Sequence, residues 1–249
     1  MFTDVAETVA SHLDTAQSLT VITGAGVSAP SGVPTFRGPQ GLWKNHRPEQ
    51  LATPEAFASD PEMVWEWYNW RRELVAKCQP NDAHRVLARW SHTNPSTTII
   101  TQNVDGLHER AGTANVLRFH GSIWDLQCWR QCEAPMTHWS DDSIPLQPLP
   151  PRCPHCSGLA RPGVVWFGES IPTDVLTKSL QATRCDVFLT IGTSAVVHPA
   201  ASLLHSAKQH GAFTSEINLE ATPSSGDVDL AIQGSADTVL VEIDRLRSK

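Results

Sequence analysis

The 249-residue chain has few basic residues and no long apolar run. Its 19 Lys and Arg are outnumbered by 26 Asp and Glu, which gives a formal net charge of −7. This balance offers no general attraction to nucleic acid or to an anionic membrane, so neither is expected as a partner. No apolar stretch approaches the roughly 20 residues that a membrane-spanning helix needs.

The N-terminal stretch, MFTDVAETVASHLD, contains no Lys or Arg, which argues against a secretory signal or a transit peptide. We therefore expect a cytoplasmic protein, and a monomer. In that compartment the six cysteines favour a metal site or free thiols over disulfides.

A glycine-rich stretch, GAGVSAPSGVPTFRG from Gly24 to Gly38, follows an apolar run at 19–23 that is typical of a buried strand. Gly24, Gly26 and Ala29 fit G-x-G-x-x-G/A, in which glycines let backbone N–H groups approach a pyrophosphate. A plain turn after a strand has the same composition, so this motif alone leaves both interpretations open. The acidic ribose partner expected about 20 residues further on is replaced by Trp43-Lys44-Asn45. A dinucleotide held in an unusual way is the hypothesis, with Thr35-Phe36-Arg37 able to cover it.

Alternating apolar runs and helical spacings predict a parallel α/β sheet. We expect strands at 97–101, 115–119, 164–167, 186–191, 213–219 and 239–241, and helices at 4–17, from Asp60 onward, at 83–90 and at 199–210. Most of these strands end in polar or glycine-rich residues, namely Gly24-Ala25-Gly26, Gln102 to Asp105, His120-Gly121, Gly192-Thr193-Ser194 and Asn218. In open α/β sheets the ligand binds beyond the carboxyl ends of the strands, so five such ends favour one ligand cleft.

Four cysteines in two close pairs predict a metal site. Cys128-x3-Cys132 and Cys153-x2-Cys156 are separated by a proline-rich spacer, which is the pattern of a closed tetrahedral Zn²⁺ site. Four unrelated thiols are the alternative. Four thiolates leave no open coordination position, so we expect one structural zinc ion.

The motifs in their chain order resemble those of the sirtuins, which are NAD-dependent protein-lysine deacylases. The resemblance covers residues 18–243 and rests on GAGVS at 24–28, SGVPTFR at 31–37, TQNVDGLH at 101–108, His120-Gly121, Gly192-Thr193-Ser194 and Asn218. The phrase RPGVVWFGE at 161–169 resembles the class III and bacterial members. The implied architecture is α/β: a large Rossmann-like domain (1–45, 92–125 and 160–249), a helical insertion (46–91) and a zinc-binding module (126–159).

The resemblance implies NAD as cofactor and His120 as general base. The acyl oxygen would attack the nicotinamide ribose, and His120 would then activate a ribose hydroxyl, giving nicotinamide, O-acyl-ADP-ribose and free lysine. The alternative for His120 is a structural role after a strand. The alternative for Gln102, Asn103 and Asp105 is a polar turn that caps the following helix. Asn103 is implied as the second catalytic residue. The implied cofactor contacts are Gly24, Ala25, Gly26, Ser28, Thr35, Phe36, Arg37, Trp43, Gln102, Asn103, Val104, Asp105, Gly192, Thr193, Ser194, Asn218, Glu220 and Ala236.

The implied partners are acyl-lysine proteins or peptides. Tyr68 and Arg71 lie three apart on the predicted helix and hence on one face. They resemble the acyl-pocket pair of class III sirtuins, in which the guanidinium binds a terminal carboxylate. Ala52 matches a small pocket residue, so removal of succinyl or malonyl groups is expected beside deacetylation. An amphipathic helix with a solvated Arg71 is the alternative. The substrate peptide would lie along Val164, Val165, Trp166 and Phe167, which are otherwise sheet core.

Two other functions stay open. An ADP-ribosyltransferase or NAD glycohydrolase would cleave the same glycosidic bond without an acylated peptide. A non-catalytic NAD-sensing or zinc-containing adaptor is the third, and the presence of His120, Asn103 and Asp105 together argues against it.

Overall fold

Two sheets of different kinds organise the chain. In the computed structural model, residues 3–35, 50–94, 96–133 and 137–247 are described. The first sheet is parallel, with the strand order β3-β2-β1-β7-β8-β9. Its strands are β1 (Leu19–Thr23), β2 (Thr97–Thr101), β3 (Val116–Arg118), β7 (Val187–Ile191), β8 (Phe213–Asn218) and β9 (Leu230–Gln233). The second sheet is antiparallel, in the order β5-β4-β6, with β4 (Gly121–Cys128), β5 (His138–Ser140) and β6 (Ala160–Val164).

The carboxyl ends of the central parallel strands lie level with one another. Thr23 at the end of β1 pairs with Thr101 of β2 on one side and with Ile191 of β7 on the other. The chain runs outward from β1 through β2 to β3, and outward in the other direction from β7 through β8 to β9. The strand order therefore reverses between β1 and β7, which is where open α/β sheets bind their ligands.

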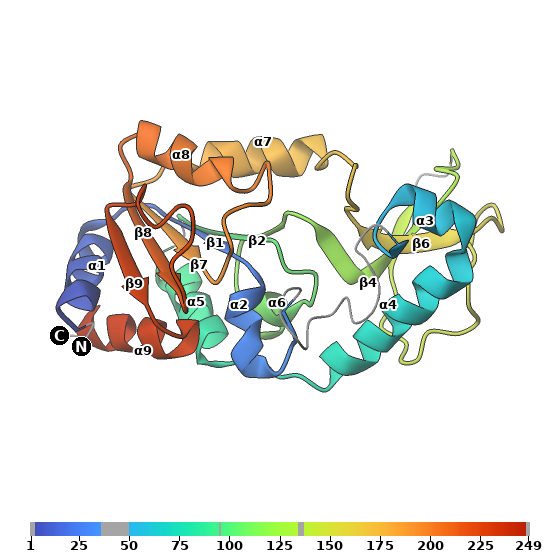
Figure 1. Cartoon of the computed structure of the whole chain (residues 1–249), viewed down its shortest axis with the longest axis horizontal. Helices are drawn as coiled ribbons and strands as arrows, with labels where there is room; N and C mark the ends of the chain where they lie inside the picture. Colours follow the sequence, from blue (N-terminus) through green and yellow to red (C-terminus); the bar gives the residue numbers. More distant parts are fainter. Residues whose placement is uncertain (1–2, 36–49, 95, 134–136, 248–249) are drawn as a thin grey trace.

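Helices cover both faces of the parallel sheet. On one face pack α1 (Thr3–Thr15), α5 (Asp82–Thr93) and α9 (Ala236–Arg247), whose apolar side chains share one core with the strands. On the other face pack α7 (Thr173–Ala182) and α8 (Ser202–Gln209), seen along the upper side of Figure 1. Both faces are covered, so the central strands β1 and β7 are buried along their whole length and do not alternate between buried and exposed residues.

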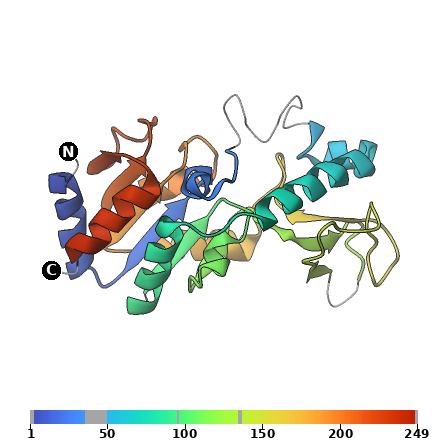
Figure 2. The ribbon, with the colours of Figure 1, turned by 90° about the horizontal axis from the view of Figure 1, so that it is seen from below.

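The antiparallel sheet forms a separate part with α3 (Pro54–Ser59) and α4 (Pro61–Ala76). Figures 1 and 2 show this part at the opposite end of an elongated molecule from α1 and α9. It has its own core, to which α3, α4, β4 and β6 contribute. Short segments α2 (Ala25–Ser28), the 3₁₀ turn η1 (Ala29–Ser31) and α6 (Leu107–Arg110) lie near the middle.

Arg72 fastens α4 to the small sheet. Its side chain is fully buried, and it donates to the main-chain oxygens of Ile123 (2.9 Å) and Ser143 (3.0 Å). It also pairs with the carboxylate of Asp141 at 3.7 Å. Removing one partner of a buried ion pair typically costs about 3–5 kcal/mol, so this contact is important for the placement of α4.

Most expected elements are confirmed. The Asp60 cap of α4 is formed, since Asp60 Oδ1 accepts from the Met63 amide at 2.9 Å. No strand lies within the described residues between 50 and 90. The division into three sequence segments stays a prediction, and β4 crosses the boundary placed between 125 and 126. Among the described residues, no helix has the length and apolar character to span a membrane.

Two strand predictions are wrong. Val239-Leu240-Val241 lies inside α9, and the last strand is β9, for which no strand was expected from the sequence. The buried residues of α9 have helical spacing: Ala236, Val239, Leu240 and Ile243. A run of three apolar residues fits the period of a helix and that of a strand equally well. The strand predicted at 164–167 ends at Val164. Beyond it, the Trp166 amide donates to the Glu169 carboxylate at 2.8 Å and not to a neighbouring strand.

Candidate functional site

The turns after β1 and β7 are in direct contact. The Gly24 amide donates to the Ile191 carbonyl (3.0 Å), and the Gly26 amide donates to the Gly192 carbonyl (2.8 Å). A Cβ on Gly26 would lie 2.7 Å from the Gly192 Cα, and Gly192 itself has a φ of +59°. Glycine is therefore required at both positions by close approach. Ala25 is half-buried beside them.

A buried polar network lies at the ends of β1 and β2. Ser28 Oγ donates to Asp105 Oδ2 at 2.8 Å, and the Leu107 amide donates to Asp105 Oδ1 at 2.9 Å. Asn103 Nδ2 donates both to Ser28 Oγ (3.1 Å) and to the Gly24 carbonyl (3.0 Å). Burial raises the pKa of Asp105, against the effect of these hydrogen bonds. The network links the glycine turn to the Gln102–Asp105 segment. Val104 joins β4 to it, because its carbonyl accepts from the Ile123 amide at 3.0 Å.

Two buried histidines that were not expected from the sequence to have a role, His84 and His108, lie next to this network. His108 Nε2 is 3.0 Å from Thr23 Oγ1, and His84 Nε2 is 3.4 Å from Ser28 Oγ. Their ring centroids are 4.9 Å apart. Burial lowers the pKa of His84 to about 3 and that of His108 to about 4, so both are neutral at neutral pH. The only sequence indication was that His108 ends the TQNVDGLH motif.

His120 lies just before β4, where the two sheets meet. Its Nδ1 is 3.1 Å from the Gln102 carbonyl oxygen, and its own carbonyl accepts from the Val165 amide at 2.9 Å. A carbonyl oxygen only accepts, so Nδ1 carries the proton in the neutral ring and Nε2 has a free lone pair. Burial lowers the pKa of His120, and the Gln102 hydrogen bond acts in the opposite direction. At neutral pH the ring is a neutral base with a fixed tautomer.

Thr193 connects the ends of β2, β7 and β8. Gln102 Nε2 donates to Thr193 Oγ1 at 2.9 Å, and Asn218 Nδ2 donates to the Thr193 carbonyl at 2.8 Å. A small pocket opens beside Gln102 and Thr193, with walls from β1 and α8. Ser194 and Glu220 are exposed nearby in sequence, and Ala236 is buried at the start of α9.

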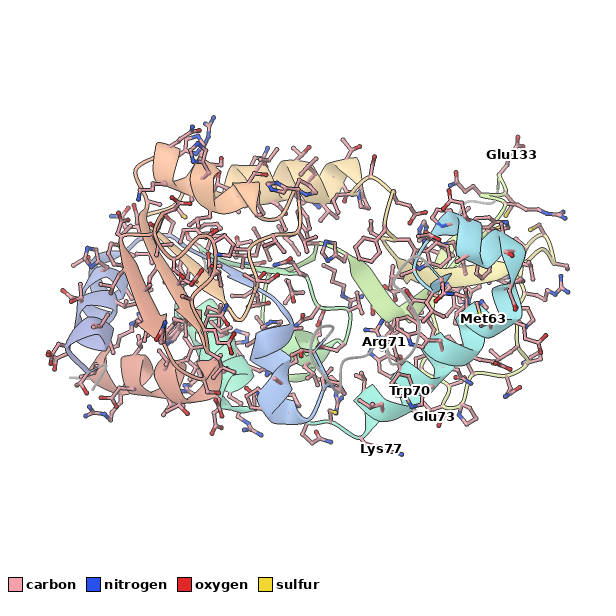
Figure 3. The ribbon with its side chains drawn as sticks, viewed as in Figure 1. Met63, Trp70, Arg71, Glu73, Lys77 and Glu133 are labelled. Carbon is pink, nitrogen blue, oxygen red and sulfur yellow. The ribbon has the colours of Figure 1, made fainter. Side chains whose placement is uncertain are left out.

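The expected acyl-pocket residues come together in the core of the small part. Tyr68 and Arg71 are 2% and 5% exposed, which excludes the alternative of a solvated arginine. Figure 3 shows Arg71 on the side of α4 toward the centre of the molecule, whereas Lys77 lies at the outer side. The Arg71 guanidinium carbon is 4.8 Å from the Trp67 ring centroid. Burial lowers the pKa of Arg71, and Tyr68 and Asp105 oppose this effect, so the guanidinium lies within electrostatic reach of the Asp105 network.

The segment after β6 contacts both His120 and the core of the small part. The Phe167 amide donates to the Ala52 carbonyl at 2.9 Å, and Ala52 is 6% exposed in the same core. The main-chain donors of Val165, Trp166 and Phe167 are thus used within the chain. Phe167 is 51% exposed and Val164 is buried. The role of these residues in substrate binding stays a prediction. Thr35 is half-buried, whereas Phe36, Arg37 and Trp43 lie outside the described residues.

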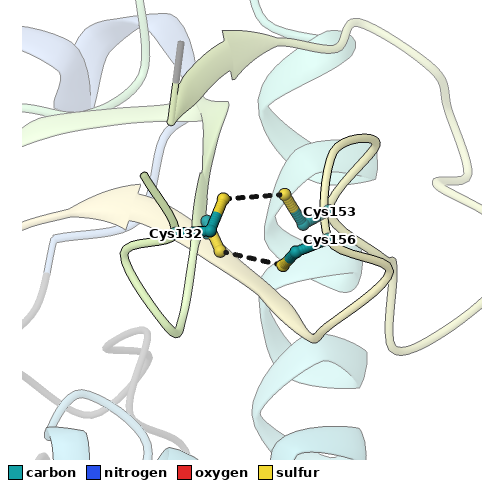
Figure 4. Close-up of side chains that lie close together, drawn as sticks. Cys132, Cys153 and Cys156 are labelled. Carbon is teal, nitrogen blue, oxygen red and sulfur yellow. Dashed lines mark hydrogen bonds between the residues drawn. The ribbon is translucent and has the colours of Figure 1, made fainter. Parts of the chain in front are cut away.

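The four cysteines of the two pairs converge on one point. Their sulfur atoms lie within 4.8 Å of one another, with Cys128 and Cys156 at 3.6 Å and Cys132 and Cys153 at 3.9 Å (Figure 4). A tetrahedron with Zn–S bonds of about 2.3 Å has sulfurs about 3.8 Å apart, so these residues fit Zn²⁺. Burial raises the pKa of Cys128, but hydrogen bonds from Cys132, Cys156 and Cys153 outweigh it and bring the pKa to about 7. The set is closed, which indicates a structural metal.

The parallel sheet with its glycine turn and polar strand ends, together with the cluster of four cysteines, defines a nucleotide-binding α/β protein with an appended metal-binding part. A family profile described as the Sir2 family matches residues 24–199. The chain is 47% identical over 234 residues to an NAD-dependent protein deacylase of Aquifex aeolicus, covering 93% of this chain and 96% of that protein. This chain therefore belongs to the Sir2 family, as the motifs indicated.

Solved structures agree with this assignment. A Sir2 homologue in complex with NAD superposes with a TM-score of 0.90 at 45% identity, covering 97% of this chain and 94% of the other. Sir2Af2 bound to a myristoylated histone peptide superposes with a TM-score of 0.77 at 30% identity, covering 98% and 97%. The predicted fold class, a Rossmann-like α/β domain with a zinc-binding part, is confirmed.

Proposed function

We propose that the protein removes acyl groups from lysine side chains of proteins or peptides in a reaction that consumes NAD. The ribose of NAD receives the acyl group and one water molecule is consumed to release the amine, so the products are nicotinamide, O-acyl-ADP-ribose and free lysine. The names of the relatives and the NAD and acyl-peptide complexes among the similar structures support this proposal. The observation that carries it is the neutral His120 ring, whose Nδ1–H donates to Gln102 at the edge where the strand ends meet.

His120 acts through Nε2 as the general base for a ribose hydroxyl. Its hydrogen bond to Gln102 fixes the tautomer and aims the ring, and burial keeps the ring neutral near pH 7. Asn103 holds the glycine turn and Ser28 together and presents an uncharged amide to the cofactor. An amide donates and accepts hydrogen bonds without bringing a charge to the reacting ribose. We also propose that the other predicted cofactor contacts between Gly24 and Ala236 bind NAD.

The acyl pocket selects for chains that end in a carboxylate. Arg71 is a buried cation surrounded by Trp67, Tyr68 and other residues of an apolar core. A guanidinium binds a carboxylate in a bidentate manner, and a contact of this kind is stronger in a buried site than in water. Ala52 is a small residue of the same core. Succinyl- or malonyl-lysine is therefore removed at least as well as acetyl-lysine.

Release of nicotinamide tests this function against its alternatives. The protein is incubated with NAD alone, with an unmodified peptide, and with matched acetylated and succinylated peptides. Release that requires the acylated peptides supports deacylation. Release without any peptide contradicts it and indicates an NAD glycohydrolase, whereas transfer of ADP-ribose to the unmodified peptide indicates an ADP-ribosyltransferase. No release under any condition favours the NAD-sensing adaptor. That the protein acts as a cytoplasmic monomer stays a prediction.

A further inference from the structure

Trp166 is fixed from three directions in the core of the small part. Its main-chain amide donates to Glu169 Oε2 at 2.8 Å, and the Arg161 guanidinium carbon is 3.5 Å from the centroid of its ring. Arg161 Nη2 in turn donates to Glu169 Oε2 at 2.8 Å, which closes the arrangement. The edge of the indole faces α4, where Nε1 is 2.9 Å from Tyr68 Oη. Trp166 is 2% exposed, so its orientation is set by these contacts and not by solvent.

The direction of the Trp166–Tyr68 hydrogen bond follows from chemistry. An indole Nε1–H only donates, so the phenolic oxygen of Tyr68 must be the acceptor. The hydroxyl hydrogen of Tyr68 then points away from Trp166, toward another acceptor. Arg71, whose guanidinium carbon is 5.7 Å from the Tyr68 ring centroid, only donates and cannot be that acceptor. Within the described part of the chain, Tyr68 Oη makes no other hydrogen bond.

We infer that Trp166 is a positioning residue that determines acyl selectivity, because it commits the Tyr68 hydroxyl to donate toward the terminal carboxylate of an acyl chain held by Arg71. This inference rests on the proposed function and adds the residue that orients the pocket. A hydroxyl that accepts one hydrogen bond becomes a stronger donor in the next, so the indole also strengthens the contact to the carboxylate. An acetyl group has no terminal carboxylate, so its removal does not depend on this orientation.

The surroundings of Tyr68 agree with a donor role. Burial raises the pKa of Tyr68, which keeps the phenol protonated at neutral pH. The Phe167 amide is held by the Ala52 carbonyl, so the segment that carries Trp166 is tied to the small pocket residue opposite. Tyr68 is the only tyrosine of the chain, and no other phenol can substitute for it.

Steady-state kinetics with matched succinyl and acetyl peptides test the inference. Trp166→Phe removes the indole donor and keeps an aromatic ring, and we expect KM for the succinyl peptide to rise about three- to tenfold, the effect of one neutral hydrogen bond. Any change in peptide binding along Trp166 affects both peptides alike, so the rise in KM is measured relative to the acetyl peptide, and kcat should change equally for both. In the Tyr68→Phe background the same substitution should have no further effect on the succinyl peptide, because no hydroxyl remains to be oriented.

Trp139→Phe is the matched control, since Trp139 is a half-buried tryptophan of β5 and packs against the same core. Zinc content and thermal unfolding show that each variant is folded. Equal losses on both acyl groups, or losses of Trp166→Phe and Tyr68→Phe that multiply in the double variant, overturn the inference. If the wild-type protein removes neither acyl group, the proposed function fails. If the wild-type protein prefers the succinyl peptide but Trp166→Phe affects both peptides equally, only this inference is refuted.

NMR provides a second test if Trp166→Phe does not fold. With ¹³Cζ-labelled tyrosine the wild-type protein gives one signal, from Tyr68. The Trp166 indole N–H signal is identified among the nine tryptophans by its shift in Tyr68→Phe. Both signals should move when the succinyl peptide binds and should respond little to the acetyl peptide. A tyrosine signal that moves without any indole signal overturns the inference.

Discussion

His120 Nδ1 lies 3.1 Å from the main-chain oxygen of Gln102, and this contact leaves Nε2 as the only basic atom of the ring. The same residue receives a hydrogen bond from the Val165 amide at its carbonyl oxygen, so both sheets meet at His120. A proton acceptor is thus held between the strand ends that we propose bind the cofactor and the segment that we propose binds the substrate.

The acid limb of the pH–activity profile should reflect His120. The base form is active, so activity is present above the pKa of His120 and is lost as the pH falls through it. Burial lowers this pKa from its ordinary value of 6.5, and we expect kcat/KM for an acyl peptide to have its acid inflection below pH 6.5. Replacement of His120 by Ala should lower kcat by about 10²- to 10⁴-fold. An unchanged acid limb in His120→Ala would show that another group is the base.

Gly26→Ala should destabilise the cofactor turn. The added Cβ would lie 2.7 Å from the Gly192 Cα, and backbone cannot yield easily. Overpacking of this kind costs about 1–3 kcal/mol, which for a chain of this length lowers Tm by roughly 2–10 °C. NAD affinity measured by calorimetry should fall as well. Gly226→Ala is the control, because no atom lies within 4 Å of a Cβ there, and it should leave Tm and NAD affinity unchanged.

Cys153→Ser should abolish stoichiometric zinc binding and disrupt the small part. Metal analysis of the purified wild-type protein should give one zinc per chain, because four sulfurs form a single closed cluster. Loss of zinc should lower Tm and activity together, since β4 runs from Gly121, next to His120, to the ligand Cys128. Cys185→Ser, whose thiol lies outside the cluster, should retain zinc. A zinc-free wild type with full stability would contradict the structural role.

Arg71→Met should separate the two acyl activities. The substitution removes the buried cation and keeps an apolar side chain of similar length, so kcat/KM for a succinyl peptide should fall by at least about tenfold. Deacetylation should stay within about threefold of wild type, because an acetyl group gives the guanidinium no carboxylate to bind. Arg85→Met, which removes an exposed arginine of α5, serves as the control. Equal losses on both peptides would refute the acyl-pocket assignment.

The sequence predicted the elements with strong local patterns. The apolar β-branched runs gave β1, β2 and β7, and the Asp60-Pro61 start of α4 was correct because the cap is formed by neighbouring residues. The cysteine spacing predicted a cluster that the structure confirms. Val239-Leu240-Val241 was misassigned because three apolar residues fit a strand and a helix equally well.

The contacts that orient the site could not be predicted, because they join distant segments. Trp166 and Tyr68 are 98 residues apart, and His84 reaches Ser28 across 56 residues. No local pattern shows that α5 places His84 beside the polar network, or that the segment after β6 bends toward α4. The strand expected at 164–167 ends at Val164, and two residues further on the Trp166 amide donates to the Glu169 carboxylate.

The measurement that tests the central claim most directly is mass spectrometry of both products after incubation with NAD and a succinylated or acetylated peptide. The account predicts deacylated peptide and O-acyl-ADP-ribose in equal amounts, with nicotinamide, and at least about 10²-fold less deacylated peptide from His120→Ala at the same enzyme concentration and time. Free ADP-ribose formed at the same rate with and without acylated peptide would contradict it.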